Sequence, residues 1–157
     1  FGLMMYEQPL GRHALEDMAE LRREVQTPVC ADESAETMAM VERIIELGSA
    51  QIINIKIQRV GGIKVARRMH DRAQEAGLNC WMGTMPELGI ASTEAIHLAT
   101  LPNFLYPTDV ESSSRWYVDD LIEPAISIDA GGFLYPRSVT VNREKLERYA
   151  VRRAVFS

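Results

Sequence analysis

Short apolar runs alternate with longer stretches in which apolar residues recur every three or four positions. The short runs predict strands and occupy residues 4–9, 28–34, 52–57, 79–83 and 104–109. The stretches between them predict amphipathic helices at residues 15–25, 38–47, 63–77 and 90–98. Such alternation with short connections is typical of α/β proteins. We therefore expect about five parallel strands with intervening helices.

Ionisable residues follow the first three predicted strands at nearly constant spacing. Glu7, Asp32 and Lys56 lie 25 and 24 residues apart, about the length of one strand–helix unit. In a parallel barrel the carboxyl ends of consecutive strands meet at one mouth, so these side chains would converge. A lone carboxylate at a strand end is usually structural. Two carboxylates together suit Mg²⁺ (or Mn²⁺), and a lysine beside them suits acid–base chemistry.

Two further candidates lie next to these residues. Glu33 follows Asp32 directly and would either orient Asp32 or Lys56, or act as a helix-start acid favoured by the helix dipole. Asn54 lies two residues before Lys56 and is a candidate for supporting the site or contacting substrate.

The later strands carry four more candidates. Trp81 and Met82 would line a substrate pocket or belong to the core, as aromatic and methionine residues in strands usually do. Glu87, in the following loop, would contact a substrate ammonium or amide group, or begin a helix. Asp109 ends the last predicted strand and would contact substrate or only terminate the strand.

Composition narrows the class of protein. Apolar residues make up 46% and charged residues 25%, which is ordinary for a soluble globular protein. The net charge of −5 and the lack of a basic cluster interleaved with aromatic residues argue against a nucleic-acid partner. No apolar run approaches a membrane span, and no secretory signal pattern is present. Cys30 and Cys80 lie inside predicted strands and are expected to be reduced, buried thiols. We expect a cytoplasmic protein without a membrane partner.

The length is short for a closed barrel. The chain has 157 residues, whereas a (β/α)₈ barrel typically needs about 250. Five strands of a barrel would leave two open edges and an exposed apolar lining. We therefore expect this chain to be the C-terminal part of a longer polypeptide whose N-terminal half is missing here. The alternative is a short protein that assembles as a homo-oligomer.

Several short motifs, in this order and spacing, resemble one known family. They are Glu-Gln-Pro-Leu at 7–10, Ala-Asp-Glu-Ser at 31–34, Ile-Asn-Ile-Lys at 53–56, Arg-Val-Gly-Gly at 59–62, Trp-Met-Gly-Thr-Met-Pro-Glu-Leu-Gly-Ile at 81–90 and Asp-Val-Glu-Ser-Ser-Ser-Arg at 109–115. The chain resembles the C-terminal half of an enolase-superfamily barrel of the muconate-cycloisomerase-like subgroup. The nearest likeness is to o-succinylbenzoate synthases and N-acylamino acid racemases. Residues 1–137 would be the catalytic barrel part, and 138–157 a C-terminal tail with a short helix.

The resemblance implies a role for each residue of the predicted site. Glu7 and Asp32 would be the second and third Mg²⁺ ligands, and Lys56 the acid–base residue on one face of a small carboxylate substrate. The reaction would be removal of a proton α to a carboxylate through an enolate, in racemisation of N-acylamino acids or in dehydration to o-succinylbenzoate. Dipeptide epimerases and muconate-type cycloisomerases are the alternatives. Epimerases usually carry Asp-x-Asp where this chain has Asp109-Val110-Glu111.

Other family features have no counterpart in these 157 residues. The family places a Lys-x-Lys motif and its first metal-binding aspartate on strands that would precede Phe1, and no residue here takes their place. Its Gly-Pro-Gly-x-Gly loop is also lacking after Arg137. We therefore expect the chain to be inactive by itself. A catalytically incomplete fragment or assembly module is the remaining hypothesis.

Overall fold

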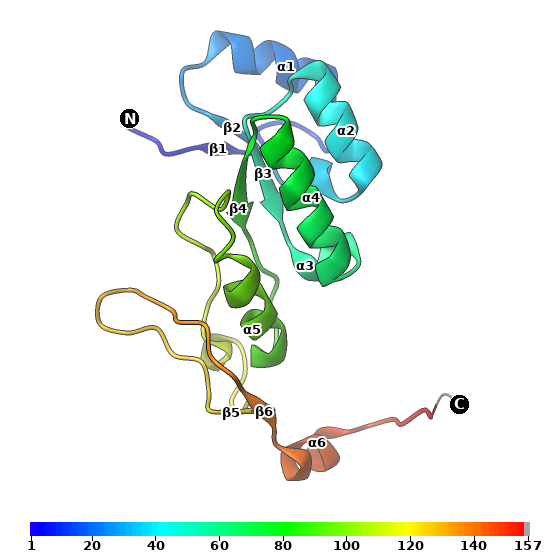
Figure 1. Cartoon of the computed structure of the whole chain (residues 1–157), viewed down its shortest axis with the longest axis vertical. Helices are drawn as coiled ribbons and strands as arrows, with labels where there is room; N and C mark the ends of the chain where they lie inside the picture. The colour runs from blue at the N-terminus through cyan, green and yellow to red at the C-terminus, as the bar shows by residue number, and fades with distance from the viewer. Residues whose placement is uncertain (156–157) are drawn as a thin grey trace.

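A four-stranded parallel sheet forms the centre of the molecule. A computed structural model describes residues 1–155. The strands β1 (Tyr6–Glu7), β2 (Val29–Ala31), β3 (Ile52–Ile55) and β4 (Asn79–Met82) lie side by side in chain order. The helices α1, α2 and α4 pack along one side of the sheet (Figure 1). The predicted α/β fold with parallel strands is confirmed.

The central strands are buried along their whole length. All three residues of β2 and all four of β3 are inaccessible or nearly so. Strands of a parallel sheet that are covered on both faces are continuous apolar runs rather than alternating ones. Met18 of α1 and Met69 of α4 pack in the same core and are fully buried. The core therefore lies between the sheet and the helices that cover it.

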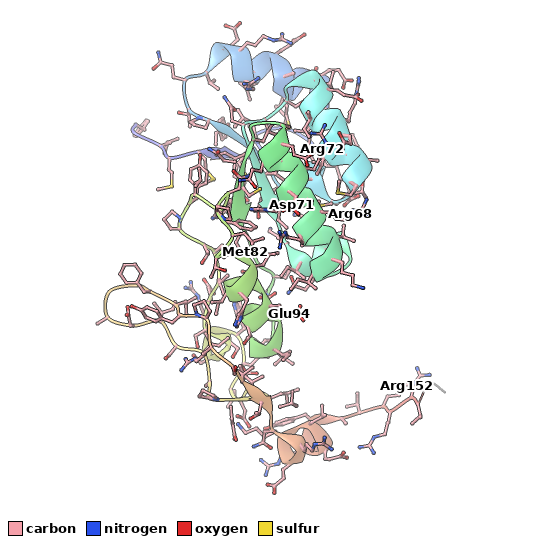
Figure 2. All side chains as sticks on the ribbon, in the orientation of Figure 1. Arg68, Asp71, Arg72, Met82, Glu94 and Arg152 are labelled. Carbon is pink, nitrogen blue, oxygen red and sulfur yellow. The ribbon has the colours of Figure 1, made fainter. Side chains whose placement is uncertain are left out.

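The helices begin and end close to the predicted positions. They are α1 (Leu15–Glu24), α2 (Met38–Leu47), α4 (Ile63–Glu75) and α5 (Gly89–Leu98), with a four-residue helix α3 (Ile57–Val60) after β3. Thr37 caps α2 by accepting from the Met40 N–H at 3.2 Å, and Gly48 ends it at φ 64°. The outer side of α4 carries charged residues, including Arg68, Asp71 and Arg72 (Figure 2).

The fifth predicted strand is only partly formed. Residues 104–109 run beside β4, but a single parallel bridge, Cys80 to Phe104, meets the strand criterion. Further along, the Asp109 N–H donates to the Met82 carbonyl at 3.0 Å. Pro107 has no N–H to donate, which interrupts a regular ladder. The segment still follows the sheet edge and brings Asp109 to the carboxyl ends of the strands.

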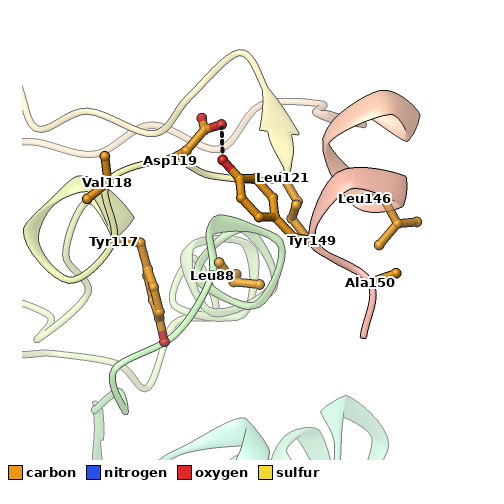
Figure 3. A pocket seen from close by; sticks show the side chains of 8 residues that line it. All are labelled: Leu88, Tyr117, Val118, Asp119, Leu121, Leu146, Tyr149 and Ala150. Atoms are coloured by element: carbon orange, nitrogen blue, oxygen red, sulfur yellow. Dashed lines mark hydrogen bonds between the residues drawn. The ribbon is translucent and has the colours of Figure 1, made fainter. Parts of the chain in front are cut away.

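The C-terminal region folds around a short antiparallel pair. β5 (Ile122–Glu123) pairs with β6 (Thr140–Val141), and α6 (Arg143–Tyr149) follows. Lys145 Nζ lies 2.6 Å from Asp119 Oδ1, and the Tyr149 hydroxyl donates to Asp119 Oδ2 at 3.3 Å. Asp119 and Tyr149 also line an apolar pocket of about 400 Å³, which Figure 3 shows. The predicted division at residue 137 stays a prediction.

Within residues 1–155, no helix combines the length and the apolar character needed to cross a membrane.

Candidate functional site

Glu7, Asp32 and Lys56 meet in one groove at the carboxyl ends of the strands. Glu7 is the last residue of β1, and Asp32 and Lys56 come directly after β2 and β3. Lys56 Nζ lies 3.0 Å from Asp32 Oδ2. The groove has a volume of about 620 Å³ and is lined by Glu7, Gln8, Leu10, Gly11, Arg12, Asp32, Glu33, Lys56 and Asp109. The parallel register places these side chains together, although the chain separates them by about 25 residues each time.

Two cations hold the carboxylate of Asp32. Besides Lys56, Arg59 donates from Nη1 to Asp32 Oδ1 at 2.6 Å. Asp32 is only 5% exposed, so an unpaired charge there would be costly. Sequence reasoning quoted Arg59 only within the Arg-Val-Gly-Gly motif. Arg59 follows Lys56 by three residues, and residues three apart lie on the same face of a helix. This spacing could have predicted that both side chains reach the same strand end.

Glu7 accepts a hydrogen bond from a residue two strands away. Asn54 Nδ2 donates to Glu7 Oε1 at 2.9 Å, reaching across β2. Partial desolvation raises the pKa of Glu7 above its ordinary value; the Asn54 hydrogen bond opposes this shift, and the charge of Asp32 adds to it. A cation at this position would offset the electrostatic repulsion between the carboxylates of Glu7 and Asp32.

Gln8 connects the end of β1 to the segment after β2, and sequence reasoning missed this role. Its Oε1 accepts from the N–H groups of Asp32 and Ser34 at 2.9 and 3.1 Å. Its Nε2 donates to the Leu10 carbonyl at 2.8 Å. Gln8 has φ 37°, a conformation that non-glycine residues rarely adopt. The side-chain contacts of Gln8 therefore fix an otherwise unfavourable backbone beside Glu7 and Asp32.

Two of the secondary candidates also line the groove. Glu33 is exposed and begins the short helix η1 (Glu33–Ala35); within residues 1–155 its side chain makes no hydrogen bond to Asp32 or Lys56. Asp109 faces the groove from the segment beside β4. The Thr84 hydroxyl donates to the Asp109 carbonyl at 2.8 Å and fixes this position. Desolvation, and then the charge of Glu111, raises the pKa of Asp109.

Three secondary candidates lie outside the groove. Met82 is fully buried in the core, and Trp81 donates from Nε1 to the Pro107 carbonyl at 2.7 Å, which holds the neighbouring segment. Glu87 is buried before α5 and accepts from the Ser92 hydroxyl at 3.2 Å. Burial raises the pKa of Glu87, against the effect of that hydrogen bond. None of the three side chains lines the groove. The Met82 carbonyl holds Asp109 at its edge by accepting from the Asp109 N–H, and Trp81 holds the neighbouring Pro107.

Most of the chain matches a known protein family. Residues 1–139 match the family described as enolase C-terminal domain-like. The chain belongs to the enolase superfamily. The predicted resemblance is confirmed by this match and by the relatives below.

Curated relatives cover both reactions to which the sequence pointed. The o-succinylbenzoate synthase of Geobacillus stearothermophilus is 40% identical over 99% of this chain, which covers 43% of that protein. The N-succinylamino acid racemase of Thermus thermophilus is 41% identical over 86% of this chain, which covers 37% of that protein. The chain therefore spans about two fifths of the length of the curated relatives it matches.

A solved structure supports the same fold. A probable mandelate racemase from Alicyclobacillus acidocaldarius aligns with a TM-score of 0.90 and 31% identity. The alignment covers 96% of this chain and 42% of the other. The four parallel strands described above thus form the C-terminal part of an enolase-type barrel.

Proposed function

We propose that this chain supplies two metal ligands and one acid–base residue to an enzyme that removes a proton α to a carboxylate. The observation that carries the proposal is the convergence of Glu7, Asp32 and Lys56 in one groove at the ends of consecutive strands. Family membership supports it, since relatives at about 40% identity are named as a synthase and a racemase.

The donor set fits part of a Mg²⁺ site. Glu7 and Asp32 offer hard carboxylate oxygens, the ligand type that Mg²⁺ prefers in octahedral geometry. Within residues 1–155 no group of three acidic, histidine or cysteine side chains is arranged to hold a metal, so further ligands would come from substrate, water or residues outside this chain. When bound, the metal would supply positive charge that stabilises the negatively charged oxygens of an enolate.

The amine of Lys56 is placed to accept the α proton of the substrate. Its Nζ is held 3.0 Å from Asp32, beside the carboxylate that would bind the metal. Lys56 would act after releasing the proton of its ammonium group to solvent: its amine would take the proton from the α carbon, leaving the electron pair on the substrate as an enolate. In a racemisation a second acid would return a proton to the opposite face. In a dehydration the enolate would expel a β-hydroxyl group, which would leave as water with the proton that Lys56 took up.

We propose N-acylamino acids and the precursor of o-succinylbenzoate as the two substrates to test. Both follow from the relatives, whose identities to this chain differ by only one percentage point, at 40% and 41%. Because the chain spans about two fifths of those proteins, selectivity between the substrates would depend strongly on residues outside it.

The test is an assay of both reactions with the full-length protein that contains these residues. Glu7→Gln, Asp32→Asn and Lys56→Ala should each lower kcat/KM by at least about 100-fold in the presence of Mg²⁺. The matched control is Asp71→Asn on α4, an ion-paired aspartate remote from the groove, which should leave the rate unchanged. Full activity in Glu7→Gln or Asp32→Asn would reject the metal-ligand roles, and full activity in Lys56→Ala would reject the base.

A further inference from the structure

Asn54 is a polar residue inside an otherwise apolar strand. Its neighbours Ile52, Ile53 and Ile55 are fully buried, and Asn54 itself is 1% exposed. Burying an amide costs free energy unless it is hydrogen-bonded. Within residues 1–155 the side chain makes one hydrogen bond, from Nδ2 to Glu7 Oε1, and its Oδ1 has no partner. The contact to Glu7 therefore fixes the orientation of the amide.

Gly83 leaves the space that the amide of Asn54 occupies. A Cβ added at Gly83 would lie 2.1 Å from Asn54 Oδ1 and 2.8 Å from both Cγ and Nδ2. Gly83 does not have a positive φ, so its backbone would accept any L-residue. The structure thus requires a glycine here for its size. Any larger residue would push the amide of Asn54 out of its place.

Asn54 also contributes to the surroundings of the second carboxylate. Its carbonyl accepts from Arg59 Nη2 at 2.8 Å, while Nη1 of the same guanidinium binds Asp32 at 2.6 Å. One residue of β3 is therefore hydrogen-bonded to Glu7 directly and to Asp32 through Arg59. Oε1 of Glu7 already accepts from Asn54, whereas no hydrogen bond within residues 1–155 reaches Oε2, so Oε2 is the freer oxygen for a cation.

We propose that Asn54, held in place by the absence of a side chain at Gly83, is a positioning residue that selects which oxygen of Glu7 faces the metal. The inference rests on the proposed function, since it assumes that Glu7 binds a divalent cation. Groups that orient metal ligands commonly change metal affinity about 10- to 100-fold when removed. The geometry predicts that Gly83 acts only through Asn54.

The test measures Mn²⁺ affinity by electron paramagnetic resonance in the full-length protein without substrate. Asn54→Ala should raise the Mn²⁺ Kd about 10- to 100-fold. Gly83→Ala, which keeps the donor but displaces it, should also raise the Kd. In the double variant the added Cβ meets no amide, so Gly83→Ala should have no further effect in the Asn54→Ala background.

Asn103→Ala is the matched control. Asn103 is another buried asparagine, 8% exposed, whose Nδ2 donates at 2.9 Å to the carbonyl of Leu78 at the opposite end of β4. This variant should lower the melting temperature and leave the Mn²⁺ Kd unchanged. If Asn54→Ala does not fold, the Mn²⁺ Kd of Gly83→Ala tests the inference alone: a raised Kd supports it, and an unchanged Kd rejects it.

The outcomes separate this inference from the proposed function. A wild-type protein that binds no Mn²⁺, or a Glu7→Gln variant with unchanged Kd, would reject the metal site and the inference with it. Tight binding that depends on Glu7 but changes less than twofold in Asn54→Ala would reject the inference alone. If Gly83→Ala raises the Mn²⁺ Kd by the same factor in the Asn54→Ala background as in the wild type, Gly83 does not act through Asn54, and that part of the inference is rejected.

Discussion

Replacing Asp120 with alanine should strongly destabilise the fold. Asp120 is 8% exposed and accepts from the Gly89 N–H, the first residue of α5, at 3.1 Å through Oδ2. It also accepts from the Leu121 N–H at 2.6 Å and from the Ser113 hydroxyl. One buried carboxylate thus joins the start of α5 to the short 3₁₀ helix η2 (Ser113–Arg115).

The magnitude follows from the groups that lose their partner. Loss of a side-chain cap at a helix N-terminus typically costs about 0.5–2 kcal/mol. The Ser113 hydroxyl is 2% exposed, and an unsatisfied buried polar group costs about 1–3 kcal/mol. Together these contributions predict a decrease of about 3 kcal/mol in the free energy of unfolding. Asp120→Asn keeps an acceptor of the same shape and should lose less.

Urea unfolding, followed by circular dichroism on the full-length protein, measures this change. Asp129→Ala is the matched control because Asp129 also accepts from two backbone N–H groups, of Gly131 and Phe133, each at 2.9 Å. Asp129 is exposed, so water replaces the lost acceptor and the cost should stay below about 1 kcal/mol. If Asp120→Ala and Asp129→Ala destabilise equally, burial is not the source of the effect and the reasoning is refuted.

Two further predictions concern the core and the pH dependence of stability. Ile53→Ala removes a fully buried side chain from β3 and should cost about 2–5 kcal/mol in urea unfolding, whereas a loss below 1 kcal/mol would contradict its central place. The raised pKa of Glu87 means that the folded protein loses stability as pH rises from the ordinary value of 4.5 through the folded pKa. Glu87→Gln cannot titrate, so its melting temperature relative to wild type should rise as the pH increases above 4.5. A trend of opposite sign for Glu87→Gln would contradict the burial argument.

Local patterns were enough to predict the architecture. Apolar residues recur along the face of an element that is buried, so their spacing reveals where each element lies. It located β2 to β4 and the four main helices within a few residues. The fifth strand was the exception, because Pro107 and neighbouring contacts decide how far a ladder continues. Constant spacing also brought Glu7, Asp32 and Lys56 to the same edge, since each strand–helix unit returns the chain to that edge.

The partners of these residues were decided only by the tertiary structure. Asn54 reaches Glu7 across an intervening strand, and the space for it depends on a glycine of a third strand end. Arg59 shares Asp32 with Lys56 because α3 turns back over the strand end. Such contacts depend on the register and twist of neighbouring strands, which the order of residues along one strand does not encode. The sequence by itself determined which strand ends come together, and the packing between strands determined which atom each side chain meets there.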